Sequence, residues 1–285
     1  MTDDLLTAPV TGTPLPVDRF RVHRTARTVD VDRVLDVLDG RLAAYLVSEY
    51  VSAADCSVLT ANFANSTDRI PRYGEGADGV EAYVLGASHI EKTTDQYLDQ
   101  AAATAPAMRA LYTGVHDPVS RLRELLLASG ALTGRPAEHD GRRAGDSKAV
   151  CWNNIGEYLL LPHDDLAQLS DPLQAGFEIQ TVRRVLAINV YPHVPGAGGA
   201  LRIWNVAPDH ATRARLGLTH SGYPYPPELL TAHPALDIPV HTGDLCLING
   251  NLIHAVLGGD DRDRGRLLLT CFSGVSDQGE FLWWT

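Results

Sequence analysis

The feature that most constrains the fold is a change of pattern at about residue 145. From there to residue 285 the sequence consists of short apolar or β-branched runs that Gly, Pro and Asp separate. The runs are KAVCWNNIGEYLLLPHDD, TVRRVLAINVYPH, GALRIWNVA, LDIPVHTGDLCLIN and GRLLLTCFSGV. Successive short strands of this kind indicate a sandwich or a barrel. We therefore predict an all-β core over about 145–285.

Helical spacing dominates the first half of the chain, over about 28–130. Leucines with charged residues between them recur at helical intervals and predict a helix over 28–63. These leucines are Leu35, Leu38, Leu42 and Leu46. Helices that precede a block of strands predict an α+β fold.

Two further helices are predicted before the strands begin. Ser88 followed by Glu91 is the pattern of a capping box and predicts the start of a helix over about 88–113. DPVSRLRELLLAS, over about 117–129, has Pro just inside its start and Gly just past its end, which is typical of a complete helix.

We expect one domain over 21–285, preceded by a flexible arm over 1–20 that is acidic and poor in apolar runs. A segment rich in Pro, His and Tyr, 207–235, interrupts the predicted strands. A long insertion in a β-core often forms a lid or a substrate loop.

Composition excludes several classes of function. Lys and Arg number 24 and Asp and Glu number 35, so the net charge is −11, which argues against nucleic-acid or anionic-membrane surfaces as partners. The longest apolar runs are too short to cross a bilayer, and the N-terminus does not resemble a signal peptide, so we expect a cytoplasmic protein. The four cysteines are scattered and are expected to be free thiols.

The strand-like run EYLLLPHDD ends in a candidate metal-binding triplet. Residues at positions i and i+2 of an extended chain project to the same side, so His163 and Asp165 can reach one ion. A polar turn at the exit of the strand is the alternative. A second triplet contains His89 and Glu91, but there the glutamate already has the predicted capping role.

The C-terminal strands supply the other candidates. His254 follows the hairpin signal Asn249-Gly250-Asn251, and Arg266 opens the apolar run LLLTCF. An arginine that enters a buried strand needs an anionic partner, and its planar fork matches a carboxylate. A salt bridge to one of the nearby aspartates is the alternative for Arg266. Arg264 lies on the same strand face and stays open as a second candidate clamp.

The order of these motifs resembles the Fe(II)/2-oxoglutarate-dependent oxygenases. It consists of HxD, then GGxLxxW at 198–204, then GDL…NG…H and an Arg-led strand, so that the resemblance covers about 150–285. More narrowly, the sequence resembles the branch that contains the carrier-independent aliphatic halogenases and their hydroxylase relatives. Weaker similarity covers RYGEGADGVEAYVLGASHIEK near 72–92.

The resemblance implies a double-stranded β-helix, or jelly-roll, core with flanking N-terminal helices. It implies His163, Asp165 and His254 as iron ligands and Arg266 as the clamp for the distal carboxylate of 2-oxoglutarate. Fe(II), 2-oxoglutarate and O₂ would be the cofactor and cosubstrates. Halogenases of this branch carry Gly or Ala where this chain has Asp165, so hydroxylation with release of succinate and CO₂ is the implied reaction.

Other residues are softer candidates. Asn189 and Tyr191 alternate with apolar residues and could face the cosubstrate, although a structural role fits equally well. Trp152 and Trp204 could line the pocket or pack in the core. His89 lies in the weakly matching stretch and could contact the substrate.

Several functional alternatives stay open on the sequence alone. The same scaffold could perform desaturation, cyclisation or halogenation. Two histidines and a carboxylate also suit a zinc-dependent hydrolase, and a non-catalytic β-barrel binding protein is a further class. The expected partner is a small molecule, such as an amino acid, a nucleotide or a natural-product intermediate, and the oligomeric state is not predicted.

Overall fold

The computed structural model describes residues 8–74, 79–154, 156–196, 199–258 and 265–285. Within this part of the chain the larger of two principal sheets has ten strands. In sheet order they are β2 (Val22–Ala26), β3 (Ala44–Ser48), β15 (Leu245–Asn249), β11 (Leu186–His193), β17 (Arg266–Val275), β9 (Lys148–Trp152), β5 (Val80–Leu85) and β4 (Ile70–Tyr73), with β18 (Phe281–Trp284) beside β17 and β6 (Gly134–Pro136) beside β18.

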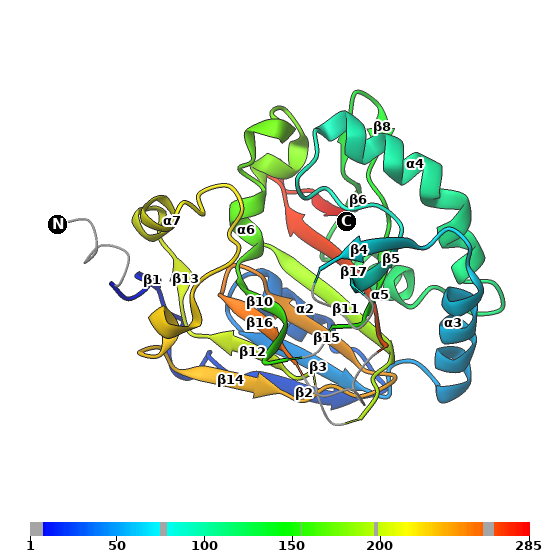
Figure 1. The fold of residues 1–285 in the computed structure, drawn as a ribbon, viewed down its shortest axis with the longest axis horizontal. Helices are drawn as coiled ribbons and strands as arrows, with labels where there is room; N and C mark the ends of the chain where they lie inside the picture. The colour runs from blue at the N-terminus through cyan, green and yellow to red at the C-terminus, as the bar shows by residue number, and fades with distance from the viewer. Residues whose placement is uncertain (1–7, 75–78, 155, 197–198, 259–264) are drawn as a thin grey trace.

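A smaller sheet lies across the larger one (Figure 1). It contains, in order, β10 (Tyr158–His163), β16 (His254–Leu257), β12 (Leu201–Trp204) and β14 (Ala235–Ile238), all antiparallel. Buried side chains from both sheets meet between them, for example Leu46 and Ile248 of the larger sheet and Ile203 and Ile238 of the smaller one. This is the predicted α+β fold with a jelly-roll core.

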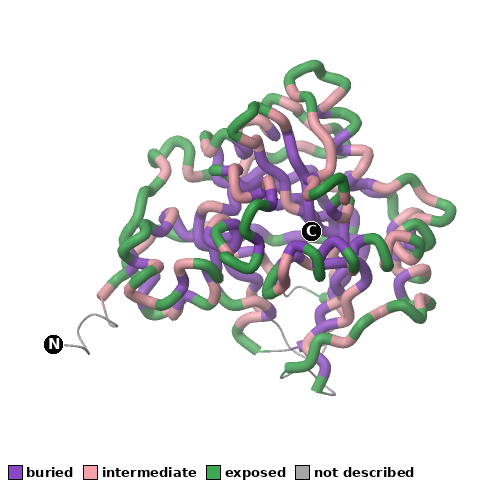
Figure 2. Tube along the Cα trace, turned by 90° about the horizontal axis from the view of Figure 1, so that it is seen from above, coloured by how far each residue is buried: buried purple, intermediate pink, exposed green. Residues whose placement is uncertain are grey.

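Helices cover the outer face of the larger sheet. They are α2 (Val31–Leu38), α3 (Ala53–Asn65) and α5 (Pro118–Ala128), and their apolar faces share one buried cluster with that sheet. A fourth helix, α4 (Thr94–Leu111), lies at the same end of the molecule as α3 and α5 (Figure 1). Figure 2 shows buried chain running through the centre with exposed turns around it.

The strands of the larger sheet have two different faces because side chains alternate along a strand. On β17, Leu267 and Leu269 pack under the helices, whereas Arg266, Leu268 and Thr270 face the space between the sheets. The other long strands of this sheet alternate in the same way. This alternation brings isolated polar residues of apolar runs into one interior cavity.

The helix predicted over 28–63 is wrong, because a strand divides it. Helix α2 ends at Leu38, and β3 then enters the larger sheet between β2 and β15. Gly40, at φ +68°, follows the helix and lets the chain turn. The leucine spacing fitted a helix, but every residue from Ala44 to Val47 is buried, and pairing on both edges overrides that spacing.

The start predicted for the second helix is also wrong. Thr93 and Gln96 form the capping box of α4, whereas Glu91 has φ +58° and lies outside the helix. The third helix is confirmed, since α5 starts at Pro118 with Asp117 as its N-cap.

The predicted flexible arm is held in place from residue 8 onward, and residues 1–7 lie outside the described part. Strand β1 (Gly12–Thr13) pairs with β13 (Ala207–Pro208), and Val10 is buried in a cluster with residues of the predicted 207–235 insertion. That insertion also contains α7 (His210–Leu216) and the 3₁₀ helix η3 (Pro227–Leu230). Arm and insertion stabilise each other by burying apolar surface.

Short elements complete the chain. They are β7 (Glu138–His139), β8 (Arg142–Arg143), α6 (Asp165–Gln168) and the 3₁₀ helices η1 (Pro172–Gln174) and η2 (Glu178–Thr181). The four cysteines are free thiols, as predicted. In the part of the chain that the structure describes, no helix combines the length and the apolar character that a bilayer crossing requires.

Candidate metal and cosubstrate site

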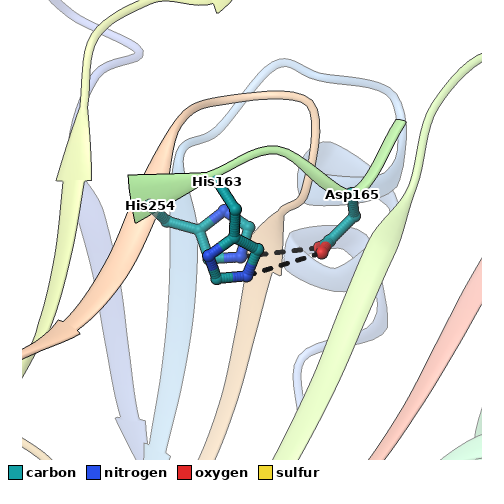
Figure 3. A group of neighbouring side chains, drawn as sticks. All are labelled: His163, Asp165 and His254. Carbon is teal, nitrogen blue, oxygen red and sulfur yellow. Dashed lines mark ion pairs between the residues drawn. The ribbon is translucent and has the colours of Figure 1, made fainter. Parts of the chain in front are cut away.

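Three side chains converge where β10 and β16 meet the start of α6. His163 and His254 lie opposite each other in the antiparallel pair β10–β16, with ring centroids 4.2 Å apart. Asp165 follows two residues after His163, and its carboxylate oxygens lie 3.8 Å and 3.6 Å from the Nε2 atoms of His163 and His254 (Figure 3). One ligand atom from each residue lies within 4.8 Å of the others.

Backbone contacts orient the two imidazoles for metal binding. Nδ1 of His163 lies 2.8 Å from the carbonyl of Leu161, and Nδ1 of His254 lies 2.9 Å from that of Leu252. A carbonyl only accepts, so each Nδ1 carries the proton. Each Nε2 therefore keeps a lone pair that faces Asp165 and is available to a cation.

The turn between β15 and β16 positions the carboxylate. The backbone N–H of Asp165 donates to the carbonyl of Gly250 at 2.8 Å. A Cβ on Gly250 would lie 2.5 Å from Oδ2 of Asp165, so only glycine leaves room for this carboxylate. The hairpin signal read from the sequence thus has a second role in the site.

Burial of the Asp165 carboxylate beside two neutral imidazoles favours a bound cation at this site. Asp165 is buried, its Oδ2 has no hydrogen-bond partner among the described residues, and burial raises its pKa to about 7. Burial also lowers the pKa of His163 and of His254 to about 4, so both are neutral at pH 7. Two neutral imidazoles and one unpartnered carboxylate fit a divalent cation.

Asp164 belongs to a different cluster. Its carboxylate accepts from Arg213 at 2.8 Å, from the hydroxyl of Tyr225 at 2.8 Å and from the backbone of Ala167 at 2.9 Å. Burial raises its pKa even so, although the guanidinium acts in the opposite direction. Of the two aspartates, the structure therefore brings Asp165, and not Asp164, beside the two imidazoles.

Arg266 lies in the same cavity as the triad. Its side chain is buried, its guanidinium lies over the ring of Tyr191 at 5.0 Å, and it donates to the carbonyl of Gly199. Burial lowers the pKa of Arg266, and none of the described carboxylates lies within ion-pair distance of it. Arg264 and the aspartates at 260, 261 and 263 lie outside the described residues.

A cavity of about 840 Å³ joins the triad to Arg266. Asn189, Tyr191 and Trp152 line it, as expected for residues near a cosubstrate or a substrate. The amide oxygen of Asn189 accepts from the hydroxyl of Thr270 at 2.9 Å.

Two of the softer candidates do not line this cavity. Trp204 is buried in a separate cluster with Tyr225 and Leu230, so it packs in the core. His89 is 1% exposed, and its ring packs edge-on against Phe272 and Trp284. The aromatic neighbours of His89 come from distant strands, which is why its sequence context did not reveal this packing.

Sequence reasoning missed other residues of the cavity. Lys148, Gln168, Gln174 and Tyr223 all line it. A signal was available for Lys148, because a lone cation in the strand-like run KAVCW is the same pattern that singled out Arg266. The glutamines lie in short helices after Asp165 and carried no comparable signal.

Comparison with known proteins decides the family. The chain is 31% identical over 255 residues to L-isoleucine 3(1)-dioxygenase from Pantoea ananatis, over 85% of this chain and 83% of that enzyme. The chain belongs to the Fe(II)/2-oxoglutarate-dependent dioxygenases. It is also 25% identical over 169 residues, 59% of each chain, to L-gamma-glutamyl-L-propargylglycine hydroxylase from Streptantibioticus cattleyicolor.

A solved structure supports the fold of this dioxygenase. The non-haem α-ketoglutarate-dependent epimerase SnoN from nogalamycin biosynthesis superposes with a TM-score of 0.51 at 15% identity, covering 85% of this chain and 83% of SnoN. No family model matches the chain. The membership sets aside the zinc hydrolase and the non-catalytic barrel, and it makes Fe(II), 2-oxoglutarate and O₂ the cofactor and cosubstrates. The narrower halogenase branch stays a prediction.

Proposed function

We propose that this dioxygenase hydroxylates an unactivated C–H bond of a small aliphatic amino acid or amino-acid derivative. His163, Asp165 and His254 are the proposed iron ligands, and Arg266 is the proposed clamp for 2-oxoglutarate. One observation carries the proposal: the carboxylate of Asp165, whose Oδ2 has no hydrogen-bond partner among the described residues, lies beside the Nε2 atoms of two imidazoles. The same cavity contains a buried arginine without an acidic partner among the described residues.

Bound iron would supply the redox chemistry that couples O₂ reduction and decarboxylation of 2-oxoglutarate, giving succinate and CO₂, to oxidation of the substrate. The chain contributes geometry. The carbonyls of Leu161 and Leu252 hold the two imidazoles in one tautomer, and three protein ligands would suit an iron that must also bind a cosubstrate and O₂.

Arg266 and its neighbours would bind and orient the cosubstrate. The guanidinium presents a planar pair of donors that matches a carboxylate bidentately, and burial strengthens that pairing. The ring of Tyr191 fixes the arginine from one side. Asn189 and Thr270, which are bonded to each other, add polar groups farther along the same interior face.

The amino-acid substrate class rests on two relatives and on the cavity. Both relatives, L-isoleucine 3(1)-dioxygenase and L-gamma-glutamyl-L-propargylglycine hydroxylase, are named for an amino acid or a dipeptide. Val150, Leu160, Val256 and Leu268 line the cavity and suit an aliphatic side chain. Its 840 Å³ is within the range of sites that hold drug-sized ligands.

Hydroxylation is favoured over the alternative outcomes on the same scaffold. The carboxylate of Asp165 would occupy the metal position that a halide needs, which argues against halogenation. Desaturation and cyclisation depend on how the substrate carbon is placed and remain alternative outcomes of the same oxidation. A cytoplasmic location likewise stays a proposal.

The test begins without oxygen. Fe(II) and 2-oxoglutarate are added to the metal-free protein, and the weak visible charge-transfer absorption of the chelate is titrated in the wild type, Asp165→Ala and Arg266→Ala. We expect a band in the wild type, none in Asp165→Ala, and roughly 100-fold weaker 2-oxoglutarate binding in Arg266→Ala. Succinate release with the standard L-amino acids then identifies the substrate. An unchanged titration in Arg266→Ala would refute the clamp.

A further inference from the structure

The distribution of lysine in this chain points to a second anion site. The sequence contains two lysines, Lys92 and Lys148, so 24 − 2 = 22 of its Lys and Arg residues are arginines. Both lysines line the cavity, and both contact Ser88. Nζ of Lys148 donates to the hydroxyl of Ser88 at 3.0 Å, and Nζ of Lys92 donates to its backbone carbonyl at 3.1 Å.

Lys148 is an interior residue of the jelly roll. It is 7% exposed and shares the inward face of β9 with Val150 and Trp152, and its ammonium lies 5.3 Å from the ring centroid of Phe272. An ammonium has three protons to donate, and Ser88 accepts one of them. None of the described carboxylates lies within ion-pair distance of Lys148.

A buried cation of this kind needs an anion. Burial, with Lys92 nearby, lowers the pKa of Lys148 to about 8, so the amine is still mostly protonated at pH 7. A buried charge without a partner is costly, and the negative charge of Asp165 offsets only part of that cost. The cavity therefore attracts an anionic group to the end where the two lysines meet.

This anion is not the distal carboxylate of 2-oxoglutarate if Arg266 binds that group. Lys148 lies opposite Thr270 in the register of β9 with β17, four residues along β17 from Arg266. At about 3.3 Å per residue, the two backbone positions are separated by roughly 13 Å along the strand. Lys148 and Arg266 therefore lie at different positions along the cavity wall and can bind two different anionic groups.

We propose that Lys148 binds the carboxylate of the substrate, which is an α-amino acid held by this group while its aliphatic chain extends over the apolar wall. Ser88 orients the ammonium, and Lys92 adds a second positive charge. The proposal rests on the proposed function and assigns the substrate end of the cavity, which the iron and cosubstrate residues leave open.

Calorimetric binding tests the proposal without turnover. L-isoleucine and L-isoleucinamide are titrated without oxygen into the Fe(II)/2-oxoglutarate complex of the wild type, Lys148→Met and Lys92→Met. Removing a buried charged hydrogen bond should weaken L-isoleucine binding roughly 10- to 100-fold in Lys148→Met, with little change for the amide or for 2-oxoglutarate. Lys92→Met, the matched substitution at the half-buried lysine, should cause a smaller loss of L-isoleucine affinity.

Two results would overturn the proposal. The first is equal binding of L-isoleucine and L-isoleucinamide by the wild type. The second is a Lys148→Met variant that still prefers L-isoleucine to the amide, or that loses affinity for 2-oxoglutarate instead. If binding depends on Lys148 but no succinate forms, the carboxylate site stands and the proposed hydroxylation fails. If succinate forms and Lys148→Met behaves like the wild type, only the carboxylate site fails.

Lysine-selective labelling gives a readout that does not need a folded variant at position 148. Because the chain has two lysines, ¹³Cε-labelled protein gives two side-chain signals, which Lys92→Arg assigns. With zinc in place of iron and 2-oxoglutarate bound, L-isoleucine should shift the Lys148 signal and raise its pKa, whereas L-isoleucinamide should not. An unmoved Lys148 signal on saturation with L-isoleucine would contradict the proposal.

Discussion

Asp164 and Asp165 are adjacent in the chain, but their carboxylates have different partners. The carboxylate of Asp165 lies beside the two imidazoles, whereas that of Asp164 accepts from Arg213, Tyr225 and the backbone of Ala167. One residue thus faces the candidate metal position, and its neighbour fastens the insertion over 207–235 to the start of α6. This division separates metal binding from structural stability and can be tested.

The two aspartates should respond differently to removal of their charge. Asp165→Asn should lose iron without lowering the free energy of unfolding of the metal-free protein, because an unpartnered buried charge disappears. Asp164→Asn should lower that free energy by about 2 kcal/mol, since charged hydrogen bonds are weakened, and should retain iron. Metal analysis and urea unfolding measure both quantities; iron loss confined to Asp164→Asn would reverse the assignment.

Arg213 should stabilise the protein through Asp164. Arg213→Met leaves a fully buried carboxylate without its cation and should cost about 3 kcal/mol of unfolding free energy. In the double variant with Asp164→Asn, the two losses should not add, because the second substitution removes the charge that the first had left unpaired. A double-mutant cycle by urea unfolding measures this coupling. Simple additivity would mean that the pair does not interact.

Iron affinity should depend on one proton. Burial raises the pKa of Asp165 to about 7, so below that pH the metal must displace a proton from the carboxylate. The imidazoles, with pKa values of about 4, are already neutral and release none near pH 7. The apparent affinity should rise about tenfold per pH unit from pH 5 to 7 and level off above. Calorimetry in buffers of different ionisation enthalpy counts the protons, and two or three at pH 6 would contradict this prediction.

Gly250→Ala should impair the metal site specifically. The added Cβ would lie 2.5 Å from Oδ2 of Asp165, so the carboxylate must move away from the imidazoles. Iron affinity should fall about 10- to 100-fold, as for other groups that orient a ligand. Anaerobic titration with Fe(II) measures this loss, with Gly130→Ala, in the exposed turn after α5 and away from the cavity, as a comparison that adds backbone strain alone. Wild-type iron affinity in Gly250→Ala would show that the carboxylate is not confined.

Local pattern was sufficient for much of the β-core and for the triad. Arg266 leads an apolar run, which predicted a buried arginine, and the alternation of side chains along β17 places it on the cavity face. The spacing of His163 and Asp165 brought both side chains to one place, although the strand ends at His163 and Asp165 already begins α6. Pairing with His254 needed only that β10 and β16 lie side by side, as they do.

The remainder depended on contacts between distant parts of the chain. The helical spacing of Leu42 and Leu46 predicts a helix through residues 44–48. In the structure this segment is a strand, because it pairs with a neighbouring strand on each side. The ion pair of buried Asp164 with partly buried Arg213 joins residues 49 positions apart, and His89 lies against the far C-terminal strand. No local signal encodes such partners, so the sequence could neither place His89 in the core nor link the insertion to the ligand turn.

The pair formed by Asp164 and Arg213 has a consequence for changing what the enzyme accepts. Five residues of the insertion line the cavity, namely Gly217, Thr219, His220, Ser221 and Tyr223. Exchanging this segment between relatives is therefore an obvious way to alter selectivity. The segment is not an independent module, because Arg213 and Tyr225 donate hydrogen bonds to Asp164, the residue before a proposed iron ligand. A transplanted loop that lacks either partner would reshape the pocket and also leave the buried carboxylate of Asp164 short of a hydrogen-bond donor, which lowers stability. Arg213 and Tyr225 should therefore be kept in any exchanged segment.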